Sequence, residues 1–335
     1  MDFARTRLAP SPTGALHLGH ARTFLVNWWL ARRAGARIFM RMDDLDLQRR
    51  KDESVQQAYD DLRWLGMDWD AFETQNPKHK TQNEVVQSER AALYAETLQE
   101  LWSRGVIFPC TCTRADIAGA ASAPHEGEAT PRYAGTCRHY ADLCGKHPQA
   151  AEVPALVKEI AGKPACWRMR VEPGVVAVSD AVFGPQQVDV AAEVGDFPLT
   201  RFDGTPAYQL ACVVDDHAMG IDCVVRGDDL LSSTPRQMLV YRALDWRPPQ
   251  FAHVPLVIGA DGKRLAKRHG ESRIAQFRAA GVSAERIVGW VAWRSGLIEH
   301  PRLLRARDGV GLFDLSKLPR DRIVLGAADF AWLNG

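Results

Sequence analysis

The chain has 335 residues, of which 46% are hydrophobic and 25% are charged, and its formal net charge is only +1. This composition is typical of a globular protein with a sizeable core, and the near-zero charge excludes a strongly basic nucleic-acid-binding protein. Seven cysteines in a long chain do not fit a disulfide framework, and no apolar run approaches the roughly 18 residues of a membrane span. We therefore expect a cytoplasmic protein with reduced thiols and no membrane contact.

The first hundred residues predict alternating strands and helices. A strand is expected over residues 3–9, and a helix is expected from Leu18 to Arg33, where apolar residues recur at three- and four-residue spacing. A strand at Arg37–Met42 follows, and then helices at Glu53–Leu65 and Ser88–Arg104, each closed by a glycine. This alternation is typical of a parallel, doubly wound α/β sheet.

The pattern changes after residue 109 and returns near residue 207. Residues 110–154 are rich in Cys, His, Gly and Pro, and short strands are predicted at Trp167–Val171, Val175–Val178 and Gln187–Val190. We expect residues 1–109 and 197–270 to form two halves of one domain, 110–196 an insertion, and 271–335 a small helical subdomain. The later predicted elements are a strand at Asp222–Arg226 and helices at Ala207–Ala218, Thr234–Leu244, Arg273–Ala280 and Ala284–Ser295.

Two motifs far apart in the sequence suggest one ATP site. His17-Leu-Gly-His20 opens the first predicted helix, where backbone N–H groups attract phosphate and two imidazoles three residues apart can donate to its oxygens. Lys263, Arg264, Lys267 and Arg268 place four cations within six residues, which can neutralise a leaving pyrophosphate. An ordinary helix start or a solvated basic turn explains either motif alone. Together, with no phosphate-binding P-loop in the sequence, they favour adenylate transfer over phosphate transfer.

A series of short motifs, in order, resembles the class I aminoacyl-tRNA synthetases, and among them the glutamyl group. His17-Leu-Gly-His20 is similar to the first family signature. Arg264-Leu-Ala-Lys-Arg268 is similar to the second, although Arg264, Ala266 and Arg268 depart from the usual Lys and Ser residues. The other similar motifs are Arg7–Gly14, Arg41–Asp46, Ala207–Leu210, Val214–His217 and Val225–Asp228. The resemblance implies a Rossmann-like parallel sheet with a zinc-binding insertion.

The resemblance also implies an activity and its residues. Such ligases join L-glutamate to the α-phosphate of ATP, which is used with Mg²⁺, and then pass the glutamyl group to RNA. Arg7 would anchor the substrate side-chain carboxylate in a bidentate fork, and Asp43, where relatives have Glu, would receive the ammonium group. The implied catalytic residues are His17, His20 and Lys267; the implied ATP-binding residues are His17, Gly19, His20, Arg264 and Lys267. The implied glutamate-binding residues are Arg7, Ala9, Ser11, Asp43, Tyr208 and Arg226.

The insertion carries cysteines at zinc-like spacing. Cys110 and Cys112 form a close pair and Cys137 follows, so spacing alone supplies three ligands and leaves the fourth open. Conventional candidates for the fourth are His125, His139 and Cys144, and buried cysteines without a metal are the alternative. The segment resembles the zinc module of a truncated glutamyl relative, which implies Tyr133 as the fourth ligand of one structural Zn²⁺, with His139 as the second choice.

The end of the chain bears on the RNA acceptor. Only 66 residues, 270–335, follow His269, which is short for a helical anticodon-binding part. Together with the cysteine module and the low charge, this resembles truncated relatives that esterify the queuosine base in the anticodon loop of tRNA(Asp), and we expect a monomer. Two alternatives stay open: a shortened synthetase that charges a tRNA acceptor end, and a non-catalytic tRNA- or nucleotide-binding paralogue.

Overall fold

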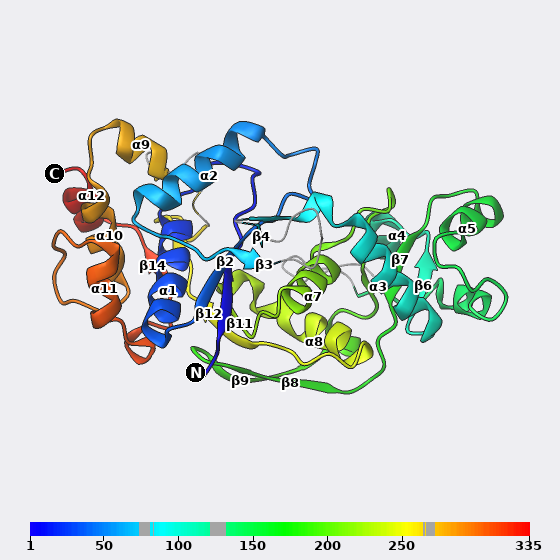
Figure 1. Ribbon diagram of the computed structural model, residues 1–335. Coiled ribbons are helices and arrows are strands. Elements are labelled where there is room, and N and C mark those ends of the chain that lie inside the picture. The colour runs from blue at the N-terminus through cyan, green and yellow to red at the C-terminus, as the bar shows by residue number, and fades with distance from the viewer. Residues whose placement is uncertain (74–80, 83, 121–131, 264, 266–271) are drawn as a thin grey trace.

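The computed structural model describes residues 1–73, 81–82, 84–120, 132–263, 265 and 272–335 (Figure 1). Strands from the two halves of the chain meet at its centre. The first set is parallel, in the order β1-β2-β5, and the second has the order β11-β12-β8-β9, with β9 antiparallel at its edge. Their bounds are β1 Arg5–Leu8, β2 Arg37–Met42, β5 Val85–Val86, β8 Val175–Asp180, β9 Gly184–Asp189, β11 Cys223–Gly227 and β12 Gln250–Val254.

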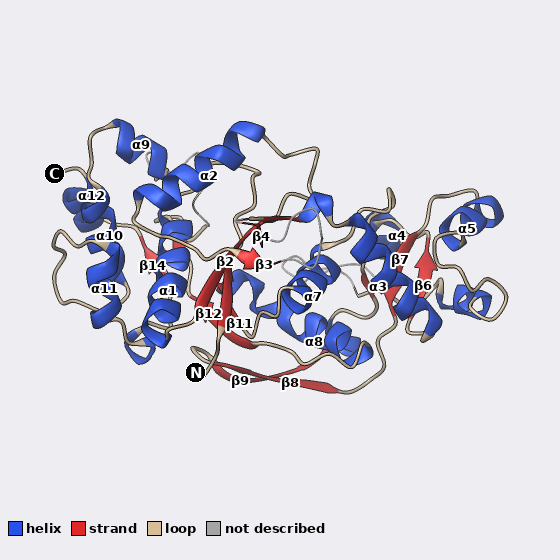
Figure 2. Cartoon of the chain, in the orientation of Figure 1, coloured by secondary structure: helices blue, strands red, loops and turns tan. Residues whose placement is uncertain are grey.

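The two sets lie edge to edge, because the backbone N–H of Asp222 donates to the carbonyl of Arg5 at 3.2 Å. Helices cover both faces of these strands (Figure 2). Alternate residues therefore enter different cores: Ile38 and Met40 pack in one hydrophobic cluster, and Phe39 packs in the other. The predicted parallel α/β fold is confirmed.

The first cluster is built with α1 (Leu18–Ala34), α2 (Asp52–Trp64) and the C-terminal helices. The second is built with α3 (Ala91–Ser103), α7 (Tyr208–Ala218) and α8 (Thr234–Ala243). The C-terminal helices are α9 Ile274–Ala279, α10 Ala284–Arg294, α11 Ala306–Leu312 and α12 Ala327–Leu333. None of the helices in the described ranges combines the length and apolar character that crossing a bilayer requires.

A smaller antiparallel sheet lies away from the centre, with the order β10-β7-β6 (Figure 1). Its strands are β6 Ile107–Cys110, β7 Cys166–Met169 and β10 Phe197–Pro198, with helices α4 Arg114–Ala120 and α5 Val153–Ala161 in the same part of the chain. The strands β8 and β9 lie within residues 110–196 but pair with β12 and with each other, so this stretch contributes to both sheets. The short strands and the short α-helix not yet given are β3 Phe72–Glu73, β4 Thr81–Gln82, α6 Val190–Glu193, β13 Val257–Ile258 and β14 Ile323–Val324.

Candidate active site

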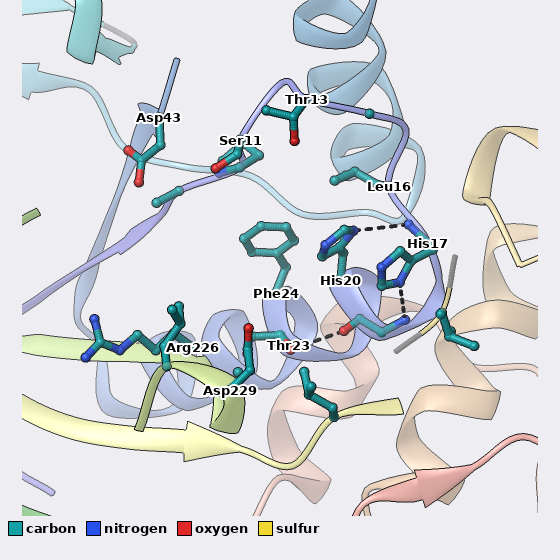
Figure 3. Close-up of a pocket in the computed structure, with 18 of the residues that line it drawn as sticks. Ser11, Thr13, Leu16, His17, His20, Thr23, Phe24, Asp43, Arg226 and Asp229 are labelled. Carbon is teal, nitrogen blue, oxygen red and sulfur yellow. Dashed lines mark hydrogen bonds between the residues drawn. The ribbon is translucent and has the colours of Figure 1, made fainter. Parts of the chain in front are cut away.

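A cavity of about 460 Å³ opens at the carboxyl ends of β1, β2 and β11, beside the N-terminus of α1 (Figure 3). This is where ligands bind in open parallel sheets. The described residues that the sequence proposed for ATP and glutamate all line it. They are Arg7, Ala9, Ser11, His17, Gly19, His20, Asp43, Tyr208 and Arg226.

The two histidines are held by the start of α1. The Nδ1 atom of His17 accepts the backbone N–H of Gly19 at 3.1 Å, and that of His20 accepts the backbone N–H of His17 at 3.3 Å. Their rings stack with centroids 3.7 Å apart. A neutral imidazole that accepts at Nδ1 carries its hydrogen on Nε2, so both rings present a donor suited to phosphate oxygens.

Two arginines and two aspartates form a buried cluster, of which Arg7 and Asp43 line another part of the cavity. Asp216 accepts from Arg7 Nε at 3.0 Å and from Arg41 Nη1 at 2.6 Å. Arg41 Nε also donates to Asp43 at 2.6 Å. Asp215 also lies 4.0 Å from Arg41 but pairs with Arg90 at 2.6 Å, so cations and carboxylates remain equal in number and the cluster has no net charge. The guanidinium of Arg7 therefore already has a carboxylate partner. The resemblance implied that Arg7 anchors the side-chain carboxylate of the substrate, but it did not predict this pairing with Asp216.

The electrostatics of the cluster differ between its two carboxylates. Burial disfavours ionisation of Asp216, but Arg7 and Arg41 outweigh it and hold the pKa of Asp216 below its ordinary value. Burial is the larger effect at Asp43 and raises its pKa, although Arg41 opposes the shift. Asp216 is thus a firmly ionised structural anion, while Asp43 is the carboxylate that gains most from a further cation such as an ammonium group.

Arg226 lies apart from that cluster, and its guanidinium has neutral partners. It donates to Tyr208 Oη at 3.1 Å, to Thr234 Oγ1 at 2.8 Å and to His253 Nε2 at 3.0 Å. It forms no salt bridge with any carboxylate in the described part of the chain. Figure 3 shows Arg226 and Asp43 on the side of the pocket away from His17. The cavity therefore has phosphate donors at one end and an uncompensated cation at the other.

The cysteines of the insertion come together beside β6. Within the described ranges, the sulfur atoms of Cys110, Cys112 and Cys137 all lie within 4.8 Å of one another. The Oη atom of Tyr133 is 3.4 Å from the Cys110 sulfur and accepts the backbone N–H of Cys137 at 2.8 Å. Three thiols and a phenol at this spacing fit a tetrahedral zinc ion, which would displace their protons. A hydrogen bond with Cys110, together with burial, raises the pKa of Cys137 to about 12.

The other candidates for the fourth ligand lie elsewhere or outside the described residues. His139 is exposed and its Nδ1 lies 3.1 Å from the carbonyl of Thr136. The Cys144 thiol donates to the carbonyl of Trp102 at 2.9 Å. His125 falls in the undescribed stretch. Tyr133 is thus the described candidate whose donor atom adjoins the three sulfurs.

The comparisons with known proteins agree with this geometry. A family model described as "tRNA synthetases class I (E and Q), catalytic domain" matches residues 4–310. The chain belongs to this family. The class I synthetase chain is similar to the glutamyl-Q tRNA(Asp) synthetase of Symbiobacterium thermophilum, with 44% identity over 98% of both chains. It is also similar to that of Rhodopirellula baltica, with 46% identity over 89% of this chain and 86% of the relative.

A solved structure supports the same fold for this synthetase. It is the crystal structure of a glutamate tRNA ligase from Elizabethkingia meningosepticum in complex with its amino acid. The two chains superpose with a TM-score of 0.78 at 25% identity, over 99% of this chain and 69% of the ligase. The matched region therefore covers a smaller share of the ligase (69%) than of the Symbiobacterium relative (98%).

The site contains residues to which the sequence analysis gave no role. Arg41 and Asp216 stood inside recognised motifs, which was the signal that could have found them. Asp180 and His253 lie in β8 and β12 outside every quoted motif, and only the strand register brings them to Arg226. Arg264 and Lys267, expected to bind ATP, lie outside the described residues.

Proposed function

We propose that this class I synthetase forms glutamyl-adenylate from ATP and L-glutamate without RNA, and then transfers the glutamyl group to the queuosine base of tRNA(Asp). The observation that carries the first half is the charge arrangement of the cavity. Phosphate donors lie at the start of α1, an acceptor for ammonium lies at Asp43, and a cation without a carboxylate partner lies at Arg226. Glutamate carries one ammonium and two carboxylates, so its net negative charge complements this arrangement.

In the first step, an oxygen of the substrate α-carboxylate attacks the α-phosphorus of ATP. The bond from that phosphorus to the bridging oxygen breaks, and pyrophosphate leaves with the electron pair. The His17 and His20 rings would donate to the phosphate oxygens at the helix N-terminus. Lys267, by its position in the second signature, would neutralise charge on the leaving group. Mg²⁺ would enter as the counterion of ATP.

The substrate contacts follow from the same cavity. Asp43 would accept the ammonium group, and Arg7 and Arg226 would hold the carboxylates, with Tyr208 beside them and Ala9 and Ser11 along the wall. One structural Zn²⁺ would be held by Cys110, Cys112, Tyr133 and Cys137. All of these groups come from one chain, so one copy would suffice to complete both sites.

In the second step, a hydroxyl oxygen of the queuosine cyclopentenediol attacks the adenylate carbonyl. The bond from that carbonyl to the AMP oxygen breaks, AMP leaves, and the hydroxyl proton is lost. The choice of acceptor rests on the relatives named glutamyl-Q tRNA(Asp) synthetase, which the chain matches over 86–98% of their length. A base that stands out of an anticodon loop can enter a cavity in a way that a paired base cannot.

Two assays test the proposal. The purified protein with ATP, Mg²⁺ and glutamate should exchange labelled pyrophosphate into ATP with no RNA present, and glutamine should not replace glutamate. Labelled glutamate should then enter tRNA(Asp) that contains queuosine, including tRNA trimmed of its 3′ CCA end, and should not enter tRNA from cells that cannot make queuosine. Charging that needs the CCA end and ignores queuosine would instead identify an acceptor-end enzyme. Absence of exchange would leave a non-catalytic protein.

A further inference from the structure

Three neighbouring strands place three polar side chains in a row, and the first of them lines the cavity. Arg226 in β11 and His253 in β12 are register partners, and Asp180 ends β8 opposite Phe251, two residues before His253. The three side chains are almost fully buried, with exposed fractions of 5%, 0% and 2%. Buried polar groups of this kind must satisfy one another, and the order of the strands decides how they do so.

The carboxylate of Asp180 sets the tautomer of His253. It accepts the Nδ1–H of His253 at 2.6 Å, and it also accepts backbone N–H groups of Val182, Phe183 and His253 at 2.9–3.1 Å. All its partners are donors, so an ionised acceptor is required there. With the hydrogen on Nδ1, the Nε2 atom of His253 must accept, and it accepts the Nε–H of Arg226 at 3.0 Å.

A neutral acceptor at His253 keeps the charge of Arg226 available. The other hydrogen bonds of the guanidinium go to the hydroxyl groups of Thr234 and Tyr208, and it lies 5.4 Å from the centre of the Phe251 ring. Burial lowers the pKa of His253 more than Asp180 raises it, which favours the neutral ring. Arg7 differs from Arg226 because Asp216 neutralises it directly. The same fold thus holds one guanidinium with a carboxylate and another without one.

His253 and Asp180 do not themselves line the cavity. Their effect on a ligand must therefore pass through Arg226. We propose that Asp180 and His253 are positioning residues, which fix the guanidinium of Arg226 for a substrate carboxylate while leaving its charge uncompensated. This inference rests on the proposed glutamate site and adds the residues that orient its second arginine.

The test uses the near-isosteric change Asp180→Asn in the full chain. Whichever way the new amide turns, its NH₂ group meets a donor, either at Val182 and Phe183 or at His253. If the ring hydrogen of His253 moved to Nε2, it would point at the Nε–H of Arg226, and the hydrogen bond between the two side chains would be lost. In glutamate-dependent pyrophosphate exchange, we expect the KM for glutamate to rise about tenfold or more, as for a lost hydrogen bond to a charged group. The KM for ATP should change less than about twofold, because no contact of Asp180 reaches the start of α1.

Two variants of His253 separate positioning from simple packing. His253→Gln can keep an acceptor for the Nε–H of Arg226, whereas His253→Leu cannot. The Gln variant should therefore retain a glutamate KM several-fold closer to that of the parent protein. The matched control is Asp329→Asn in α12, which removes another buried carboxylate that accepts from a backbone N–H and a side chain. It should leave both KM values unchanged.

Nitrogen NMR of the histidine rings supplies a readout that needs no activity. The parent protein should show His253 as the neutral Nδ1–H tautomer, and Asp180→Asn should shift it. If the parent protein fails to exchange pyrophosphate, the proposed function is wrong. The tautomer of His253 then still tests whether Asp180 fixes the state of that ring. Equal rises in the KM for ATP and glutamate, or an unchanged glutamate KM and tautomer in Asp180→Asn, would overturn the positioning role.

Discussion

Asp216 binds two arginines from different strands, since Arg7 in β1 and Arg41 in β2 both donate to its Oδ1 atom, at 3.0 and 2.6 Å. Its own backbone belongs to α7, so one carboxylate joins this helix to both strands. Arg41 is fully buried and Arg7 and Asp216 nearly so. Arg41 also pairs with Asp43, but Asp216 is the one carboxylate partner of Arg7 among the described residues.

Asp216→Asn should destabilise the fold by about 3 kcal/mol or more, because it leaves a buried cation uncompensated. Urea unfolding at pH 7 measures this change.

The dependence of stability on acidic pH should also differ between Asp216→Asn and the parent protein. The pKa of Asp216 is lowered in the folded state, so its stabilisation is present above the ordinary value of 3.8 and is lost as the pH falls through the folded value. The variant should therefore lose less stability than the parent protein on acidification below about pH 4.

A matched control for this prediction is Asp68→Asn. Asp68 is paired with Arg32 at 2.9 Å, but 73% of its side chain is exposed. Exposed pairs contribute roughly 0–1 kcal/mol, so its unfolding midpoint should hardly move. Equal losses in Asp216→Asn and Asp68→Asn would contradict the role assigned to burial.

Asp61 should make stability depend on pH in the opposite direction. It is buried in α2, and burial raises its pKa to about 6, although Arg278 lies 3.4 Å away. The folded value lies above the ordinary 3.8, so ionised Asp61 destabilises the fold. That cost is absent below pH 3.8, develops between 3.8 and 6, and is complete above 6. Asp61→Asn should thus gain stability relative to the parent protein between pH 4 and pH 8.

Thermal unfolding at several pH values measures this gain. Glu53→Gln, at an exposed position in the first turn of the same helix, is the control, and its stability should follow the pH dependence of the parent protein. A constant difference between Asp61→Asn and the parent protein from pH 4 to pH 8 would show that Asp61 does not titrate in this range.

The sequence allowed the local elements to be predicted but not all of their neighbours. The helix at Leu18–Ala34 was predicted within one residue, because its apolar spacing is regular and Gly35 ends it in a left-handed conformation at φ 67°. The strand Gln250–Val254 was missed, since it follows Arg-Pro-Pro and has only five residues. Its partner strands come from far earlier in the chain. Sequence periodicity carries no information about such pairing.

The same distinction separates the site residues. Arg7, Asp43 and Arg226 were found because they stand inside motifs whose resemblance is local in sequence. The contact of His253 with Asp180 joins residues 73 positions apart, and that of Arg7 with Asp216 joins residues 209 positions apart. The first pair exists only after β8 and β12 have assembled, and the second only after α7 has packed against β1. Physical reasoning from residue types could not place them.

Lys267→Ala tests the second signature, of which Leu265 alone lies among the described residues, where it lines the cavity. If Lys267 neutralises charge on departing pyrophosphate, its contribution appears mainly in the transition state. The turnover number for pyrophosphate exchange should then fall about 100-fold or more, with a smaller change in the KM for glutamate. Lys158→Ala, at an exposed position in the last turn of α5, is the control and should leave both values unchanged. A rise in the glutamate KM with unchanged turnover would assign Lys267 to substrate binding instead.

Tyr133→Phe tests the zinc module at a single oxygen atom. The phenol is buried and adjoins the Cys110 sulfur, and the guanidinium of Arg168 lies 4.3 Å from the centre of its ring. Burial and the neighbouring Cys110 raise the pKa of the phenol, so the bound metal ion itself would have to displace its proton. Loss of the oxygen should therefore weaken zinc retention about tenfold or more, measured as the rate of zinc release to a chelator. Tyr140→Phe, in the same cluster, should release zinc at the parent rate. Unchanged release in Tyr133→Phe, with faster release in His139→Ala, would assign the fourth ligand to the histidine.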